Sequence, residues 1–339
     1  MKFKESEIFK YNDLFYDFNE KEYIKNIEKI DAKKIELDFE NYIIISNNKI
    51  ENFSNLPTTK KSIKLSNYKE FLRIFFNPSS IDKSSLDIFF SNSNNKTFIY
   101  LIDLIEKKSF QKLNINMFFK NSNIDVFFFS FSNKNRIRFA NIRNIIENSN
   151  VNFDLSIFDS MLKIRLDNLL KTKHSSINLK NICLCKNSNK IDFFSNFNNL
   201  KPSTSSKIYF RGILYNESKV IVKSLMKIGK DSIDSEAFAS LNTLHVTKDS
   251  SSQLLPILII KNNKVKACHN SSCSYLDDEK LFYLTSRGIN ENEAKNLITK
   301  GFLGSLIKKT SDKSFMDLNF KIIEKVLKNE KIVIKDLLY

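Results

Sequence analysis

Short segments in which apolar and polar residues alternate dominate the sequence between about residues 97 and 266. Examples are residues 151–157 (VNFDLSI), 162–166 (LKIRL) and 177–179 (INL). A period of two places every second side chain on one face, so each run is predicted to be a β-strand with one buried face. The runs are separated by Asn, Ser, Asp and Lys, which predicts a mainly β fold, either a sandwich or a β-solenoid. Both fit, because no strict repeat is visible and the turns of a solenoid need not share a motif.

The alternating region is predicted to lie between two other domains. Residues 1–95 read as a mixed α/β domain, with an amphipathic helix near residues 5–30 and a strand pair at residues 42–50. Asn47 and Asn48 between the two apolar runs of that pair favour a tight turn. Residues 96–272 are then the β core, and residues 273–339 a C-terminal helical domain.

Capping residues mark the starts and ends of the C-terminal helices. Asp277 and Asp278 can cap a first helix, and Gly288 suits the left-handed position just past its end. Asn290 and Glu293 resemble a capping box that opens a second helix. The apolar positions are Phe282 and Leu284 in the first helix, Ala294, Leu297, Ile298 and Phe302 on one face of the second, and Leu318, Ile322, Ile323 and Val326 in a third at residues 315–327. Such helices are expected to cover the open end of a solenoid or to offer an apolar groove to a partner.

The net charge of +16 raises the possibility of a nucleic-acid partner, because basic surfaces neutralise phosphates. Only seven of the basic residues are Arg, and the Lys residues are scattered among Asp and Glu, whereas phosphate-binding surfaces are usually clustered and rich in Arg. The abundant Asn, Ile, Phe and Lys all have A/T-rich codons, so a compositional bias explains the charge. No nucleic-acid partner is predicted, and a basic nucleic-acid-binding β protein remains the alternative.

The sequence predicts neither a membrane span nor a secretory leader. Apolar stretches such as residues 254–260 are far shorter than the roughly 18 residues that cross a bilayer. The first 18 residues mix charged and aromatic side chains, which is not the pattern of a signal peptide. A cytoplasmic location is expected.

The four cysteines do not form a disulfide framework or paired C-x-x-C zinc knuckles, which fits a reducing compartment. Cys183 and Cys185 are predicted to share one face of a strand. Cys268 is expected to point away from His269 if residues 265–269 are extended, and both Cys268 and Cys273 are interpreted as buried thiols.

Several enzyme classes find no support in the sequence. No G-x-x-x-x-G-K-[ST] loop is present, so the chain is not predicted to be an ATPase. The alternating region lacks the clustered carboxylates of a polysaccharide-cleaving β-helix. His174 and His245 have no neighbours in the sequence that indicate metal ligation or a catalytic triad.

A distinctive series of residues runs from Pro256 to Phe302. Pro256 leads an apolar strand, V-K-A-C-H follows at residues 265–269, D-D-E-K-L-F-Y-L-T-S-R-G-I occupies residues 277–289, and an Ala-bearing helix ends in Gly-Phe at residues 301–302. In order and spacing this series resembles the SufB/SufD family of the SUF iron–sulfur cluster assembly system. Residues 201–214 and 233–244 resemble the preceding stretch of that family, so the similarity is clear over residues 200–302.

The resemblance implies a right-handed parallel β-helix flanked by terminal domains. It favours a SufD-type subunit, because SufB-type subunits typically carry Glu on both sides of the motif histidine, where this chain has Cys268 and Asn270. The usual D-type H-G-A-T is replaced by His269-Asn270-Ser271-Ser272, and Asn is the residue best able to replace Gly at positive φ. A SufB-type paralogue remains the alternative.

The resemblance also implies a role and partners. The chain is expected to be a non-catalytic scaffold that pairs with a SufB-type subunit and binds the SufC ATPase, or forms a homodimer in isolation. His269 would lie at the SufB interface, where its imidazole is the metal candidate for iron or a transient iron–sulfur cluster, with no cofactor held tightly by this chain alone. The candidates for SufC docking are Phe282, Tyr283, Arg287, Ile289, Ala294 and Phe302.

Overall fold

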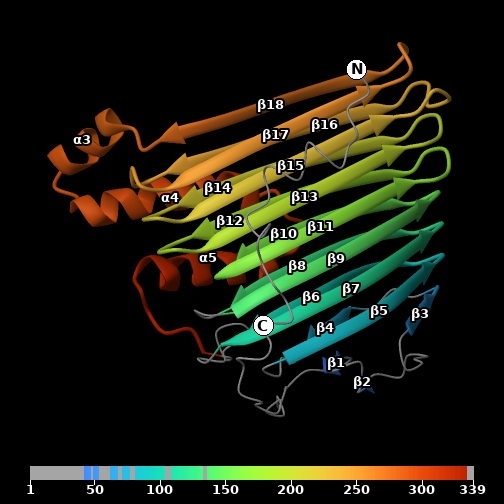
Figure 1. Ribbon diagram of the computed structural model, residues 1–339, viewed down its shortest axis with the longest axis horizontal. Coiled ribbons are helices and arrows are strands. Elements are labelled where there is room, and N and C mark those ends of the chain that lie inside the picture. Colours follow the sequence, from blue (N-terminus) through green and yellow to red (C-terminus); the bar gives the residue numbers. More distant parts are fainter. Residues whose placement is uncertain are drawn as a thin grey trace.

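The computed structural model describes residues 42–46, 49–52, 62–67, 71–76, 81–103, 108–132 and 136–333. Two long sheets dominate this part of the chain (Figure 1). The ten-stranded sheet contains β1 (Tyr42–Ser46), β2 (Lys49–Asn52), β4 (Leu72–Phe76), β6 (Asn94–Asp103), β8 (Asn123–Ser132), β10 (Asn150–Phe158), β12 (Ser176–Cys185), β14 (Ser205–Leu214), β16 (Glu236–His245) and β18 (Lys266–Tyr275). The eight-stranded sheet contains β3 (Ser62–Ser66), β5 (Ile81–Ser91), β7 (Ser109–Lys120), β9 (Arg136–Glu147), β11 (Met161–Leu170), β13 (Lys190–Asn199), β15 (Lys219–Ile228) and β17 (Ser251–Ile260).

The chain winds as a parallel β-solenoid. From β3 onward, successive strands belong to alternate sheets, and each strand pairs in parallel with the strand one turn before it. The register is continuous: β11 and β13 pair residue by residue from Met161↔Lys190 to Leu170↔Asn199. The predicted mainly β fold is confirmed, and of the two predicted architectures the chain adopts the solenoid.

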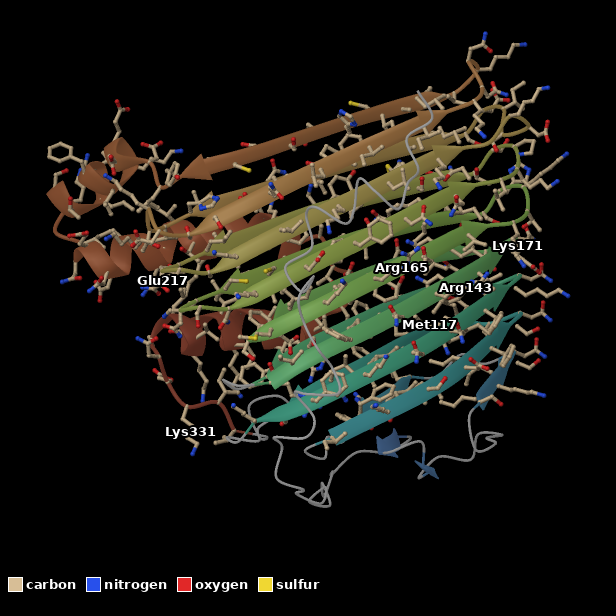
Figure 2. All side chains as sticks on the ribbon, in the orientation of Figure 1. Met117, Arg143, Arg165, Lys171, Glu217 and Lys331 are labelled. Atoms are coloured by element: carbon tan, nitrogen blue, oxygen red, sulfur yellow. The ribbon has the colours of Figure 1, made fainter. Side chains whose placement is uncertain are left out.

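The inner faces of the two sheets form one continuous hydrophobic core. Inward side chains alternate with outward ones along each strand, as in β11, where Leu162, Ile164 and Leu166 are buried and Arg165 points outward (Figure 2). Equivalent side chains stack from turn to turn, as Phe90 and Phe119 do with ring centroids 4.9 Å apart. The alternation of inward and outward side chains explains why a period of two identified the strands correctly.

One corner of the solenoid is built from left-handed residues that recur each turn. Asn92, Asn121 and Asn148 have φ values of 49°, 48° and 46°, a conformation that Asn tolerates better than most residues. Their side chains form a ladder, in which Asn121 Nδ2 donates to Asn92 Oδ1 at 3.3 Å and Asn148 Nδ2 donates to Asn121 Oδ1 at 3.0 Å. His174 occupies the same corner one turn later, with φ 59°, so it has a structural role in a turn.

A cluster of charged side chains interrupts the apolar core near another corner. Arg136 pairs with Asp103, and Arg138 Nη1 lies 2.5 Å from Asp159 Oδ1, with all four side chains fully buried. Arg138 Nε donates to Gln111 Oε1 at 2.6 Å. Burial lowers the pKa of Arg136 to about 10, which still leaves the guanidinium charged at neutral pH. The paired charges compensate one another inside the core.

Two helices cover the outer face of the ten-stranded sheet (Figure 1). They are α4 (Glu291–Ile307) and α5 (Lys313–Leu327), whereas α3 (Asp278–Ser286) projects beyond the sheet and buries none of its residues. The apolar contacts join Leu303, Leu306, Phe315, Leu318, Ile322 and Ile323 of the helices to Phe127, Phe129, Ile182 and Ile213 of the strands. Polar contacts fix the ends of α5: Lys96 Nζ lies 2.9 Å from the N-cap residue Asp312, and Lys186 Nζ donates to the Val326 carbonyl at 3.0 Å.

The predicted starts of the first two helices and the predicted end of the first are confirmed. Asp277 caps α3, Asn290 caps α4, and Gly288 follows α3 with φ 86°. The second helix does not end at Gly301 and Phe302 but continues to Ile307, and the third begins at Lys313, two residues before its predicted start. One part of the predicted apolar face is wrong: Leu297 is 56% exposed, because the side of α4 that meets the sheet carries Leu303 and Ile307 instead.

The strands of the solenoid do not stop at residue 95, where a domain boundary was expected. β5 pairs with β7 and β4 with β6 in the same parallel manner as later strands, and β18 continues to Tyr275. The predicted strand pair at residues 42–50 is confirmed as β1 and β2, which pair antiparallel. The helix expected near residues 5–30 lies outside the described residues. Among the described helices, none is long and apolar enough to cross a bilayer.

Candidate functional site

The last turn of the solenoid leaves one edge of each sheet open. β18 ends the ten-stranded sheet and β17 ends the eight-stranded sheet, so each strand has a neighbour on one side only. All residues of β18 are exposed except the half-buried Ala267, and β17 has no fully buried residue. Leu254, Leu258 and Ala267 pack on the core from one side only. The hydrophobic core is therefore thinly covered at this end.

His269 lies on this open edge. It pairs with Ala239 of β16, whose side chain is in the core, so His269 faces the inner side of the sheet at the open end. Its side chain is exposed, and no hydrogen bond or ion pair joins its ring to another described residue. The sequence thus identified a histidine whose imidazole nitrogens are accessible from outside the chain.

The prediction that the two thiols near His269 are buried is wrong. Cys268 and Cys273 are both exposed, because no further strand covers β18. Cys268 pairs with Phe238 on the outer side of the sheet, so it points away from His269 as predicted. In the described part of the chain, no group of three or more His, Cys, Asp or Glu side chains is arranged to hold a metal ion.

Cys183 and Cys185 are fully buried in the core and face the same way along β12, as predicted. Their sulfur atoms lie 3.2 Å apart. The hydrogen bond between the two sulfur atoms and, as the smaller cause, burial raise the pKa of the Cys185 thiol well above its usual value. The Cys185 thiol is therefore protonated, and both cysteines are interpreted as core side chains.

An exposed aromatic surface lies on α3. Phe282 is 74% exposed and Tyr283 57% exposed, on a helix that extends away from the sheets (Figure 1). The Arg287 guanidinium is also exposed and lies 5.2 Å from the centre of the Tyr283 ring, a cation–π contact. We call Phe282, Tyr283 and Arg287 the α3 surface.

The other three docking candidates lie closer to the interior. Ala294 of α4 is fully buried, and Ile289 is half-buried. Phe302 is half-buried because Arg211 of β14 lies 5.1 Å above its ring and donates to its carbonyl oxygen at 2.5 Å. Phe302 therefore attaches α4 to the solenoid through Arg211, and neither Ala294 nor Phe302 extends the α3 surface.

Sequence reasoning missed a polar cluster around His245. This histidine is 5% exposed, and its two ring nitrogens lie 2.8 Å from the hydroxyls of Ser250 and Ser252. Ser252 also lies 3.4 Å from Cys273. His245 and Ser252 sit on different sheets and Cys273 lies one turn later, so only the winding of the solenoid brings them together.

Comparisons with known proteins indicate the family of this chain. A family model described as the SUF system FeS cluster assembly SufBD core domain matches residues 88–302, more than half of the chain. Iron–sulfur cluster assembly SufBD family proteins of Staphylococcus aureus (strain USA300) and Staphylococcus haemolyticus (strain JCSC1435) are each 30% identical to it over 118 residues. That match covers 35% of this chain and 25% of each relative. The chain, with its parallel solenoid, its open last turn and its projecting α3, belongs to the SufBD family of iron–sulfur cluster assembly proteins.

Proposed function

We propose that this chain is a SufD-type scaffold subunit of a cytoplasmic complex that assembles iron–sulfur clusters. The open last turn of the solenoid is the observation that carries the proposal. The strands β17 and β18 present unpaired backbone groups along an edge, next to apolar side chains that are covered on one side only. Such an edge is suited to pairing with a strand of another chain.

The proposed partner at this edge is a SufB-type subunit. Pairing there would cover Leu254, Leu258 and Ala267 and add backbone hydrogen bonds along β18. His269 would then lie inside the interface, where its exposed imidazole contributes one nitrogen ligand to iron or to a nascent cluster. The partner supplies the remaining ligands, such as a thiolate, so the cluster is a transient cargo of the pair.

The proposed partner at the α3 surface is the SufC ATPase. Exposed aromatic residues next to an Arg are typical of binding hot spots, and Phe282, Tyr283 and Arg287 provide this combination. Because α3 joins β18 directly to α4, movement of a bound ATPase would be transmitted to the open edge. This chain would itself hydrolyse no ATP.

The test is a pull-down of the full chain with purified SufB-type and SufC subunits, together and separately, at moderate salt. Both should bind, and His269→Ala should keep both partners while lowering cluster formation in the reconstituted complex. Binding of neither partner would contradict the scaffold role. Unchanged cluster formation by the His269→Ala complex would show that His269 is not a ligand.

A further inference from the structure

Four outward-facing side chains of the eight-stranded sheet are buried, although no described element lies over them. They are Asp192 of β13 and Ile221, Lys223 and Leu225 of β15. These side chains point outward, because alternate residues of the same strands, such as Val222 and Met226, belong to the core. The described helices that pack on the solenoid, α4 and α5, lie on the other sheet (Figure 1).

One row of residues across the outer face shows where the cover begins. Arg165, Phe194 and Lys223 are register partners on β11, β13 and β15. The Arg165 side chain is 52% exposed and points outward (Figure 2), Phe194 is half-buried, and Lys223 is only 4% exposed. Lysine is almost never fully buried without a partner, and Lys223 Nζ lies 3.4 Å from Asp192 Oδ1. A further layer therefore excludes water from this ion pair on β13 and β15.

The covered area continues as an apolar surface with a basic surround. Leu255, Ile257 and Ile259 of β17 point outward and are half-buried, next to β15 in the register. The charged side chains on the outer face of β11, β13 and β15 are the basic residues Lys163, Arg165, Lys190, Lys219, Lys223 and Lys227 and the acidic residues Asp167 and Asp192. A segment with an apolar face and acidic side chains would complement this surface.

The N-terminal segment of this chain matches the surface in charge and in pattern. Residues 1–41 contain eleven acidic and eight basic residues, whereas the whole chain has a net charge of +16. Ile8, Tyr11, Phe15 and Phe18 recur at spacings of three and four residues, which places them on one face if the segment is helical.

The same segment is long enough to reach the covered area. Strand β15 lies six strands from β3 at the far end of its sheet, roughly 29 Å at the spacing of neighbouring strands. A chain of 41 residues spans roughly 60 Å even when it is fully helical. Burial of Lys223 is complete within a single chain, so no second copy is needed to explain it.

We propose that residues 1–41 dock on the outer face of the eight-stranded sheet, over β13, β15 and β17. The apolar side chains of residues 8–18 pack on Ile221, Leu225 and Leu255, and acidic side chains of the segment face the surrounding lysines. Because β17 is the last strand of its sheet, the docked segment lies beside the open edge, on the face away from the core. The outer face of the last turn is thus occupied by this chain itself.

Photo-cross-linking of the full-length chain, without partners, tests this docking. The photoreactive residue p-benzoylphenylalanine replaces Leu255, or Asn141 of β9 as the control, which is exposed in the same row roughly 19 Å away. After irradiation of dilute protein, the probe at position 255 should form adducts with residues 1–41 of the same chain, and the probe at position 141 should form none. No adduct from position 255, adducts only with other residues or with a second copy, or equal yields at the two positions would overturn the proposal.

Lysine acetylation measures the cover on natural side chains. Lys219 and Lys223 point outward from the same strand, but Lys219 is exposed. An N-hydroxysuccinimide ester should acetylate Lys223 at least about tenfold more slowly than Lys219, because a buried amine reacts only after local opening. The full-length double variant Phe15→Asp, Phe18→Asp should raise the Lys223 rate at least about fivefold and leave Lys219 unchanged, with circular dichroism to check folding.

Equal rates at the two lysines in the unmodified chain, or an unchanged Lys223 rate in the double variant, would contradict docking of this segment. Neither measurement includes a partner subunit, so failure here is distinguishable from failure of the scaffold proposal.

Discussion

Replacing Asp159 with Asn should strongly destabilise the solenoid, because it removes the carboxylate that pairs with a buried guanidinium. Arg138 Nη1 lies 2.5 Å from Asp159 Oδ1, and neither side chain is exposed to solvent. The variant keeps the shape of the side chain and one oxygen acceptor but removes the negative charge that balances Arg138, whose other hydrogen-bond partners Gln111 and Ser130 are neutral. Breaking a buried pair in this way typically costs about 3–5 kcal/mol.

An exposed ion pair on the eight-stranded sheet provides the control. Arg165 Nε lies 2.6 Å from Asp167 Oδ2, but the two side chains are 52% and 25% exposed, and Arg165 lies on the outer face (Figure 2). Water screens this pair, so Asp167→Asn should cost no more than about 1 kcal/mol. The two variants make the same chemical change and differ in burial.

Urea unfolding followed by far-UV circular dichroism measures both costs, since the chain has no Trp to serve as a fluorescence probe. A solenoid can unfold turn by turn, so hydrogen exchange should be measured alongside urea unfolding. In Asp159→Asn the loss of protection should be localised to the amides of β9 and β10. Costs for the two variants within about 1 kcal/mol of each other would refute the view that the buried charges depend on one another.

Three further predictions concern the helices and the last turn. Ile322→Ala, on the buried face of α5, should lower the free energy of unfolding by about 2–5 kcal/mol, measured in urea. Leu297→Ala, on the exposed side of α4, should change it by less than about 0.5 kcal/mol, and similar costs would contradict the observed packing. Burial lowers the pKa of His245 from its usual 6.5, so the unfolded chain binds more protons below that pH and stability should fall from pH 7 to 5; the urea midpoint of His245→Gln should fall less, and parallel curves would count against this. Phe282→Ala should leave the midpoint unchanged but weaken binding to SufC at least tenfold, about 1.4 kcal/mol, in a titration where Leu297→Ala binds normally; normal binding by Phe282→Ala would remove this residue from the docking surface.

The strands and helix caps were predictable because they depend on local patterns. Alternation needs only the burial of one sheet face, and a cap needs only one polar side chain near the first amides, as Asp277 and Asn290 show. A signal for the solenoid itself was present but overlooked. The tripeptide Asn-Ser-Asn occurs four times, and the copies at residues 92–94, 121–123 and 148–150 form the same left-handed corner of successive turns, whereas the copy at residues 187–189 lies at another corner.

The features that depend on the stacking of turns were not predictable. Arg136 and Arg138 alternate with apolar residues, as polar residues do in any strand with one exposed face. Both arginines point inward because Asp103 and Asp159 lie next to them on neighbouring turns. The exposure of Cys273 follows from β18 being the last strand of its sheet, which alternation does not reveal.

Hydrogen exchange along β18 tests the central proposal most directly. In the free chain, the amides that point to the open edge at residues 266–275 have no strand to pair with and should exchange rapidly. Adding a saturating amount of the SufB-type subunit should slow their exchange at least about tenfold, while amides of the central strands β11 and β12 stay unchanged. A complex that forms without protecting β18 or β17 would contradict pairing through the open edge of the solenoid.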